Sequence, residues 1–121
     1  MYNIIMETNI DLISNLIQSK KFKEAKIKCE EILEKNMNNF VFLNIFAIVL
    51  FQLNEFEDAE KKWKQSIKIN SQYIDSYNNL INAYLNLEKY DDALNIIIKA
   101  IKIAPQNHEL HHKLGSLFLK K

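Results

Sequence analysis

The feature that most constrains this chain is its self-similarity at an interval of 34 residues. Ala25, Ala59 and Ala93 recur at this interval, and an aromatic residue precedes each of them by three positions. Three further apolar registers share the spacing: Leu12, Phe46, Leu80 and Leu114; Leu16, Leu50, Tyr84 and Phe118; Ile13, Ala47, Ile81 and Gly115. A fixed period of this length is typical of proteins in which one supersecondary unit is stacked many times.

Each copy of the unit has the apolar periodicity of two helices. Leu80, Ile81 and Tyr84 share one helical face, and Ala93 and Ile97 share a face of the helix that follows. The chain has only one Gly and one Pro, which favours helices joined by short turns over turn-rich β-structure. We therefore predict seven helices, near residues 8–19, 22–35, 40–53, 56–69, 74–87, 90–103 and 108–120.

The unit at residues 74–107 resembles the tetratricopeptide repeat, whose 34-residue pattern runs from aromatic through Leu, Tyr and Ala to Pro. The matching residues are Tyr77, Leu80, Ile81, Tyr84, Ala93, Ile97, Ala100 and Pro105. The other copies lack the Pro, with Met37 and Ser71 in its place. The resemblance covers about residues 6–121. It implies an all-α fold, an α-solenoid wound as a right-handed superhelix.

The resemblance also implies the organisation of the chain. Residues 1–121 form a single domain, with repeats at 6–39, 40–73 and 74–107 and a C-terminal helix at 108–121. In this family the first helix of each repeat lines a concave groove that holds a protein or peptide partner. We expect the contacts of that partner to come from Val41, Asn44, Ile45, Ile48, Asp75, Asn78, Asn79, Asn82, Asn86, His112 and Lys113.

Two features of this groove suggest how it binds. Val41, Ile45 and Ile48 would form an apolar floor, suited to an apolar anchor of the partner. The Asn row that follows could pair with a peptide backbone of any sequence, because an amide both donates and accepts hydrogen bonds. Two alternatives stay open: the floor packs against the N-terminal residues 2–5, and the Asn row reflects the abundance of Asn in this chain.

One specialisation of the family is not expected here. Repeats that bind the acidic C-terminal tails of chaperones use a carboxylate clamp, in which Lys, Arg and Asn side chains at fixed positions bind the carboxylate groups of the tail. The better of the two repeat frames matches this clamp only at Asn79 and Lys113, and Glu109 would repel a carboxylate. We therefore predict a groove without specificity for chaperone tails.

Charge and cysteine usage exclude other classes of protein. The chain has 16 basic residues, all of them Lys, and 15 acidic residues. Its net charge of +1 therefore gives no overall electrostatic attraction to nucleic acid or to a membrane. The most apolar stretch, residues 40–53, is shorter than the roughly 20 residues of a membrane-spanning helix. The N-terminus lacks the pattern of a signal peptide. Cys29 is alone, is expected in the core, and cannot form an internal disulfide. We expect a cytoplasmic protein.

The last helix carries the one sequence feature that resembles catalytic chemistry. His108, Glu109 and His112 match the His-Glu-x-x-His zinc pattern, but Phe118 stands where the longer pattern needs its third His. A catalytic zinc site takes three protein ligands. We therefore predict no enzyme, no cofactor and no metal. Zinc binding through His108-Glu109-Leu110-His111-His112 is kept as an alternative hypothesis.

The same helix is rich in apolar residues, namely Leu110, Leu114, Leu117, Phe118 and Leu119. In a complete repeat a following helix would cover some of them. Three alternatives stay open: the helix is a cap with an apolar side, the chain is a fragment of a larger repeat protein, or two chains form a homodimer through this helix. The main prediction is a protein–protein interaction scaffold, and the second is a self-associating structural module.

Overall fold

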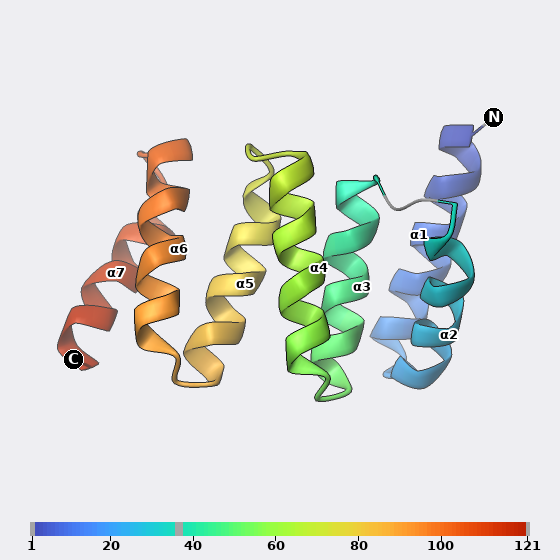
Figure 1. Cartoon of the computed structure of the whole chain (residues 1–121), viewed down its shortest axis with the longest axis horizontal. Coiled ribbons are helices and arrows are strands. Elements are labelled where there is room, and N and C mark those ends of the chain that lie inside the picture. Colours follow the sequence, from blue (N-terminus) through green and yellow to red (C-terminus); the bar gives the residue numbers. More distant parts are fainter. Residues whose placement is uncertain (1, 36–37, 121) are drawn as a thin grey trace.

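The chain folds into a row of helices, as the 34-residue period predicts (Figure 1). The computed structural model describes residues 2–35 and 38–120, which contain seven α-helices. These are α1 (Tyr2–Gln18), α2 (Phe22–Leu33), α3 (Phe40–Gln52), α4 (Phe56–Ile69), α5 (Ile74–Asn86), α6 (Tyr90–Ile103) and α7 (His108–Lys120). The prediction of an all-α fold built from helical hairpins is confirmed.

The predicted helix bounds need correction at the N-terminal end. Helix α1 begins at Tyr2, six residues before the predicted start, so residues 2–5 belong to a helix and form no separate tail. The extra turns continue a core-facing helix, because Met6 is buried. Periodicity missed them because they precede the repeated unit. The predicted packing of the side chains of residues 2–5 on the apolar floor lies outside the described residues, as does Met37.

The turn inside each hairpin has the same backbone geometry in all three repeats. Lys20, Asn54 and Glu88 are 34 residues apart and have positive φ angles of 59°, 64° and 59°. In the turn at Asn54, the N–H of Glu55 donates to the carbonyl of Leu50 at 2.9 Å and that of Asn54 to Phe51 at 3.0 Å. These two bonds define a Schellman motif, which satisfies carbonyl groups left over at the end of a helix.

Small residues set the spacing of the two helices in each hairpin. Ala25, Ala59 and Ala93 are completely buried at the start of α2, α4 and α6. A methyl side chain allows a neighbouring helix to approach closely, so the recurring alanine of the sequence is a packing requirement.

Helix α3 lies at the centre of the stack. It contacts α1, α2, α4 and α5, and seven of its residues are buried. A helix that is apolar all round needs this burial on every side. The described residues contain no helix long and apolar enough to cross a membrane.

The first helices of the repeats lie closer together than the second helices do. Helix α3 contacts both α1 and α5, whereas the described parts of α2, α4 and α6 make no close backbone contact with one another. A stack whose elements approach more closely on one side bends toward that side. The face formed by α1, α3 and α5 is therefore the inner, concave face.

Buried polar groups tie the second repeat to the third. The hydroxyl of Ser66 donates to the carbonyl of Phe40 at 2.8 Å and lies against the hydroxyl of Ser76. The phenol of Tyr84 on α5 donates to the carboxylate of Glu60 on α4. Burial, together with this hydrogen bond, raises the pKa of Tyr84 above its ordinary value. Glu60 on α4 thus joins the second repeat to the third.

We predict that Glu88→Gly stabilises the fold. A residue other than Gly costs roughly 1–2 kcal/mol in the left-handed region, and Gly avoids this cost. Gly also has greater conformational freedom in the unfolded chain, which cancels part of this stabilisation. The free energy of unfolding should rise by about 0.5–1 kcal/mol, measured by urea denaturation. The control is Lys99→Gly inside α6, which should destabilise by about 1 kcal/mol. A loss of stability in Glu88→Gly would contradict the role assigned to the turn.

Candidate functional site

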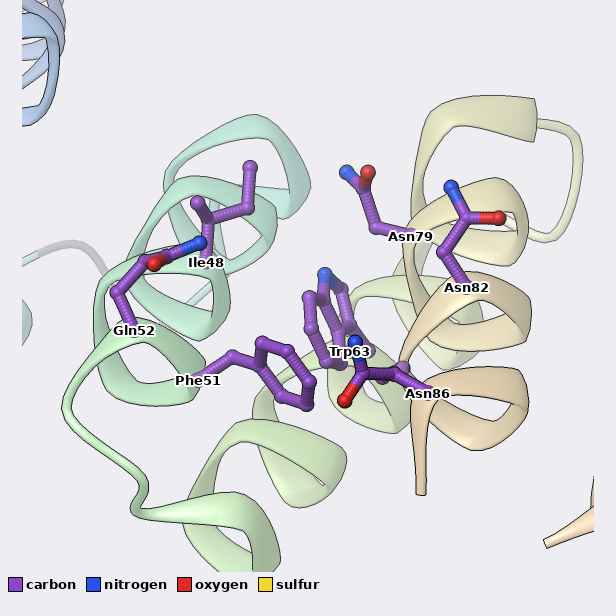
Figure 2. A pocket seen from close by; sticks show the side chains of 8 residues that line it. Ile48, Phe51, Gln52, Trp63, Asn79, Asn82 and Asn86 are labelled. Atoms are coloured by element: carbon purple, nitrogen blue, oxygen red, sulfur yellow. The ribbon is translucent and has the colours of Figure 1, made fainter. Parts of the chain in front are cut away.

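A pocket of about 200 Å³ opens on the concave face between α3 and α5. Figure 2 shows side chains of α3 on one side, asparagines of α5 on the other, and Trp63 of α4 between them. The lining residues are Ile48, Phe51, Gln52, Trp63, Asn79, Asn82, Ala83 and Asn86. A pocket of this size is smaller than the roughly 300–1,000 Å³ of a small-molecule site and suits a single side chain.

The pocket combines an apolar base with a polar rim and carries no charge. The rings of Phe51 and Trp63 lie with their centroids 6.0 Å apart, and Ile48 extends this surface. The rim consists of the neutral amides of Gln52 and the three asparagines. With no acid or base in its lining, the pocket offers contact and hydrogen bonding rather than acid–base chemistry.

Asn44 is a correction to the predicted site. It was expected to face the groove, but its side chain is only 5% exposed. Its Oδ1 accepts a hydrogen bond from the indole Nε1 of Trp63 and another from Nδ2 of Asn79, both at 2.9 Å. Buried polar groups are nearly always paired in this way. Asn44 therefore joins α3, α4 and α5 and holds the base of the pocket in place.

The structure brings four of the predicted residues together at this pocket: Ile48, Asn79, Asn82 and Asn86. Val41 and Ile45 are half-buried, and Asp75 is exposed at the start of α5, but none of the three lines the pocket. Asn78 is also outside it, and its Oδ1 is buried without a hydrogen-bond partner in the described chain.

The two predicted groove residues on α7 lie apart from this pocket. His112 is exposed, whereas Lys113 is mostly buried, with its Nζ 3.0 Å from a carboxylate oxygen of Glu109. This buried Nζ forms no hydrogen bond with the part of the chain that the structure describes. The pair further weakens any resemblance to a carboxylate clamp, because the cation already faces an acid.

The resemblance also implies that Phe51 and Gln52 face the groove, and both line the pocket, whereas sequence reasoning missed Trp63 and Ala83. The repeat pattern assigns Trp63 to the core, and the structure confirms that it is buried. One edge of the same indole nevertheless forms the base of the pocket. The indole N–H of Trp63 was a signal that the sequence analysis could have used. A buried Trp N–H needs a hydrogen-bond acceptor, and the side chain of Asn44 can supply one.

Three observations concern the His, Cys and carboxylate side chains of the described residues. Residues 2–35 and 38–120 contain no group of three His, Cys, Asp or Glu side chains that could hold a metal ion. The imidazole Nε2 of His111 lies 2.8 Å from the carbonyl oxygen of Pro105. Burial raises the pKa of the Cys29 thiol to about 12, so this residue is a core side chain and a poor nucleophile.

Solved structures of similar shape define the class of protein. The TPR domain of Arabidopsis OM64 matches with a TM-score of 0.83 and 19% identity over 95% of each chain. The first TPR of Spaghetti (RPAP3), bound to an HSP90 peptide, matches at 0.81 and 19%, covering 93% of this chain and 92% of that one. The Yersinia enterocolitica secretion chaperone SycD, in complex with a YopD peptide, matches at 0.85 and 12%, covering 96% and 94%. The fold is that of the tetratricopeptide-repeat proteins, as its sequence pattern predicts.

Sequence comparison defines the family more narrowly. The model of the coatomer epsilon subunit matches residues 10–117, and the chain belongs to this family. Coatomer subunit epsilon of Dictyostelium discoideum is 30% identical over 90 residues, which cover 74% of this chain and 30% of that relative. The chain thus matches less than a third of the length of this curated relative.

We predict that Asn44→Ala destabilises the fold although an amide is replaced by a good helix former. The change leaves the buried Nε1 of Trp63 without its acceptor, which costs about 1–3 kcal/mol. Urea denaturation followed by circular dichroism should show this loss. The matched control is Asn82→Ala on the exposed rim, expected within about 0.5 kcal/mol of wild type. Equal stabilities of the two variants would contradict the structural role of Asn44.

Proposed function

We propose that this chain is a protein-interaction module whose concave face binds a segment of another protein at the pocket between α3 and α5. One observation supports this most directly. An apolar base of Ile48, Phe51 and Trp63 is open on the inner face of the stack and is surrounded by amide side chains. Such a surface suits an apolar side chain whose own backbone needs hydrogen-bond partners.

We propose binding rather than catalysis. The pocket contains no group that could act as a nucleophile, acid or base. The rigid arrangement of Asn44, Trp63 and Asn79 favours a preformed surface, which lowers the cost of ordering side chains on binding. Neither a cofactor nor a metal is part of this proposal.

Membership of the coatomer epsilon family suggests the kind of partner. We propose that the segment belongs to another coatomer subunit and that binding takes place in the cytoplasm. A chaperone tail is not proposed, although one relative in fold is bound to such a peptide. Its acidic end would require cations in the groove, and the pocket residues of this chain are all neutral.

Charge placed in the pocket should abolish this binding. Ile48→Glu would bury a carboxylate against the partner, and Asn86→Lys would place a cation on the exposed rim with less risk to folding. In pairwise pull-downs with the other coatomer subunits of the same organism, both variants should lose at least about tenfold in affinity. The control is Ile27→Glu on the exposed face of α2, expected to bind as wild type. If both groove variants bind the partner with wild-type affinity, the proposal is wrong.

Self-association is a second candidate, favoured by a separate surface. Phe118 and Leu119 on α7 are 62% and 89% exposed, although Phe118 occupies the register of the buried Leu50 and Tyr84. Gly115 on the same helix has open space where a side chain would project. An exposed apolar patch of this kind is typical of an interface, so we propose that two copies pair through α7.

Sedimentation equilibrium of the 121-residue chain tests this second candidate. We expect a dimer at high concentration, and a monomer for the double variant Phe118→Ser, Leu119→Ser, because the exposed apolar area is removed. Leu12→Ser, which changes an exposed apolar residue on α1, is the control and should leave the dimer intact. A wild-type mass of one chain at every concentration rules out the dimer.

A further inference from the structure

Two exposed histidines on α7 have the spacing of zinc ligands. His108 and His112 are four residues apart, so their side chains lie on the same face of the helix. Neither imidazole has a hydrogen bond or an ion pair with the part of the chain that the structure describes. Two imidazoles at this spacing can bind one Zn²⁺ ion together.

The neighbouring polar side chains of α7 are already engaged elsewhere. The imidazole Nε2 of His111 lies 2.8 Å from the carbonyl oxygen of Pro105, and a carboxylate oxygen of Glu109 lies 3.0 Å from Nζ of Lys113. Within the described residues of one chain, the two histidines therefore have no third ligand. A structural zinc site takes four ligands in a tetrahedron. One copy of the chain supplies half of that set.

The exposed face of α7 continues beyond the two histidines. Gly115 and Leu119 follow at intervals of three and four residues on the same side of the helix, whereas Leu110 and Leu117 on the opposite side are buried. The space beside Gly115 is open, which allows another helix to approach closely. Of the described helices only α6 contacts α7, at the end of the row (Figure 1). This face is therefore accessible to a second chain.

A second copy is the occupant that completes the ligand set. Identical chains usually pair about a twofold axis, which brings the same surface of both copies together. If this axis runs along α7, His108 and His112 meet their counterparts, and so does Leu119. An antiparallel pair centred on the histidines would instead leave Phe118 and Leu119 beyond the start of the other copy's α7. The parallel arrangement therefore joins the histidines and the apolar patch in one interface.

We propose that two copies of this chain hold one Zn²⁺ ion between them through His108 and His112 of each α7, and that Phe118 and Leu119 support the same dimer. The four imidazole nitrogens form a tetrahedral shell, with Zn–N distances of about 2.0–2.1 Å. The site is structural, because four protein ligands leave no position for water or a substrate. This inference rests on the second candidate function, pairing through α7, and adds a ligand to it.

Sedimentation equilibrium of the 121-residue chain without a purification tag tests this inference. The chain is measured in EDTA, in Zn²⁺ and in Mg²⁺. Zn²⁺ should tighten the dimer at least about tenfold relative to EDTA, because the ion binds the dimer more tightly than the monomer. Mg²⁺, which prefers oxygen ligands, should have no effect. Equilibrium dialysis should find one zinc ion for every two chains.

Histidine variants assign the effect to the proposed ligands. His108→Ala and His112→Ala each remove two of the four ligands, so each should abolish the effect of zinc on the dimer. The matched control is His111→Ala, at an exposed histidine of the same helix, which should keep the effect. Co²⁺ gives a second readout: the visible absorption of tetrahedral Co²⁺ should appear with the wild type and be absent with His112→Ala.

The outcomes separate this inference from the pairing on which it rests. A dimer of equal strength in EDTA and in zinc overturns the metal site and leaves the apolar pairing through α7. Zinc bound at one ion per chain without dimerisation, or zinc-dependent dimerisation that persists in both histidine variants, also overturns the metal site. A monomer in all three solutions overturns the metal site and the pairing together.

Discussion

The structure depends on the fact that no single hairpin of this chain can bury its own apolar surface. Helix α3 shows this most clearly, since its residues are apolar on all sides and it needs α1, α2, α4 and α5 around it. Stability therefore depends on contacts between repeats in addition to those within each hairpin, which is the general property of stacked repeat proteins. Packing within each hairpin requires the recurring alanines, because a larger side chain at the completely buried Ala59 would force the packed helices apart.

The groove is a consequence of this packing. The first helices approach one another and the second helices do not, so the stack curves and exposes the inner sides of α3 and α5. Asn44 adds a polar contact between the helices of the groove, since its buried Oδ1 accepts hydrogen bonds from both Trp63 and Asn79. A binding surface whose base is fixed by the core loses little conformational freedom on binding.

Fold and specificity are separate properties in this class of protein. Structures that hold chaperone or secretion peptides share the shape of this chain at 12–19% identity, which is a likeness of fold alone. What distinguishes this groove is its chemistry: neutral amides and aromatic rings where a clamp for acidic tails would place cations. Function must therefore be argued from the site rather than from the solenoid.

The 34-residue period by itself determined the helices, the hairpins and most of the core, because stacked units repeat their packing positions and those positions must be apolar or small. The resemblance to the tetratricopeptide repeat, and not the period, implied that Ile48, Asn79, Asn82 and Asn86 face the groove. Periodicity could not show that Asn44 is buried, that Trp63 reaches the pocket, or that α1 starts at Tyr2. The start of α1 was missed because residues 2–5 precede the repeated unit. The burial of Asn44 and the position of Trp63 depend on contacts between residues far apart in the chain, such as Asn44 with Asn79, and only the tertiary structure brings such residues together.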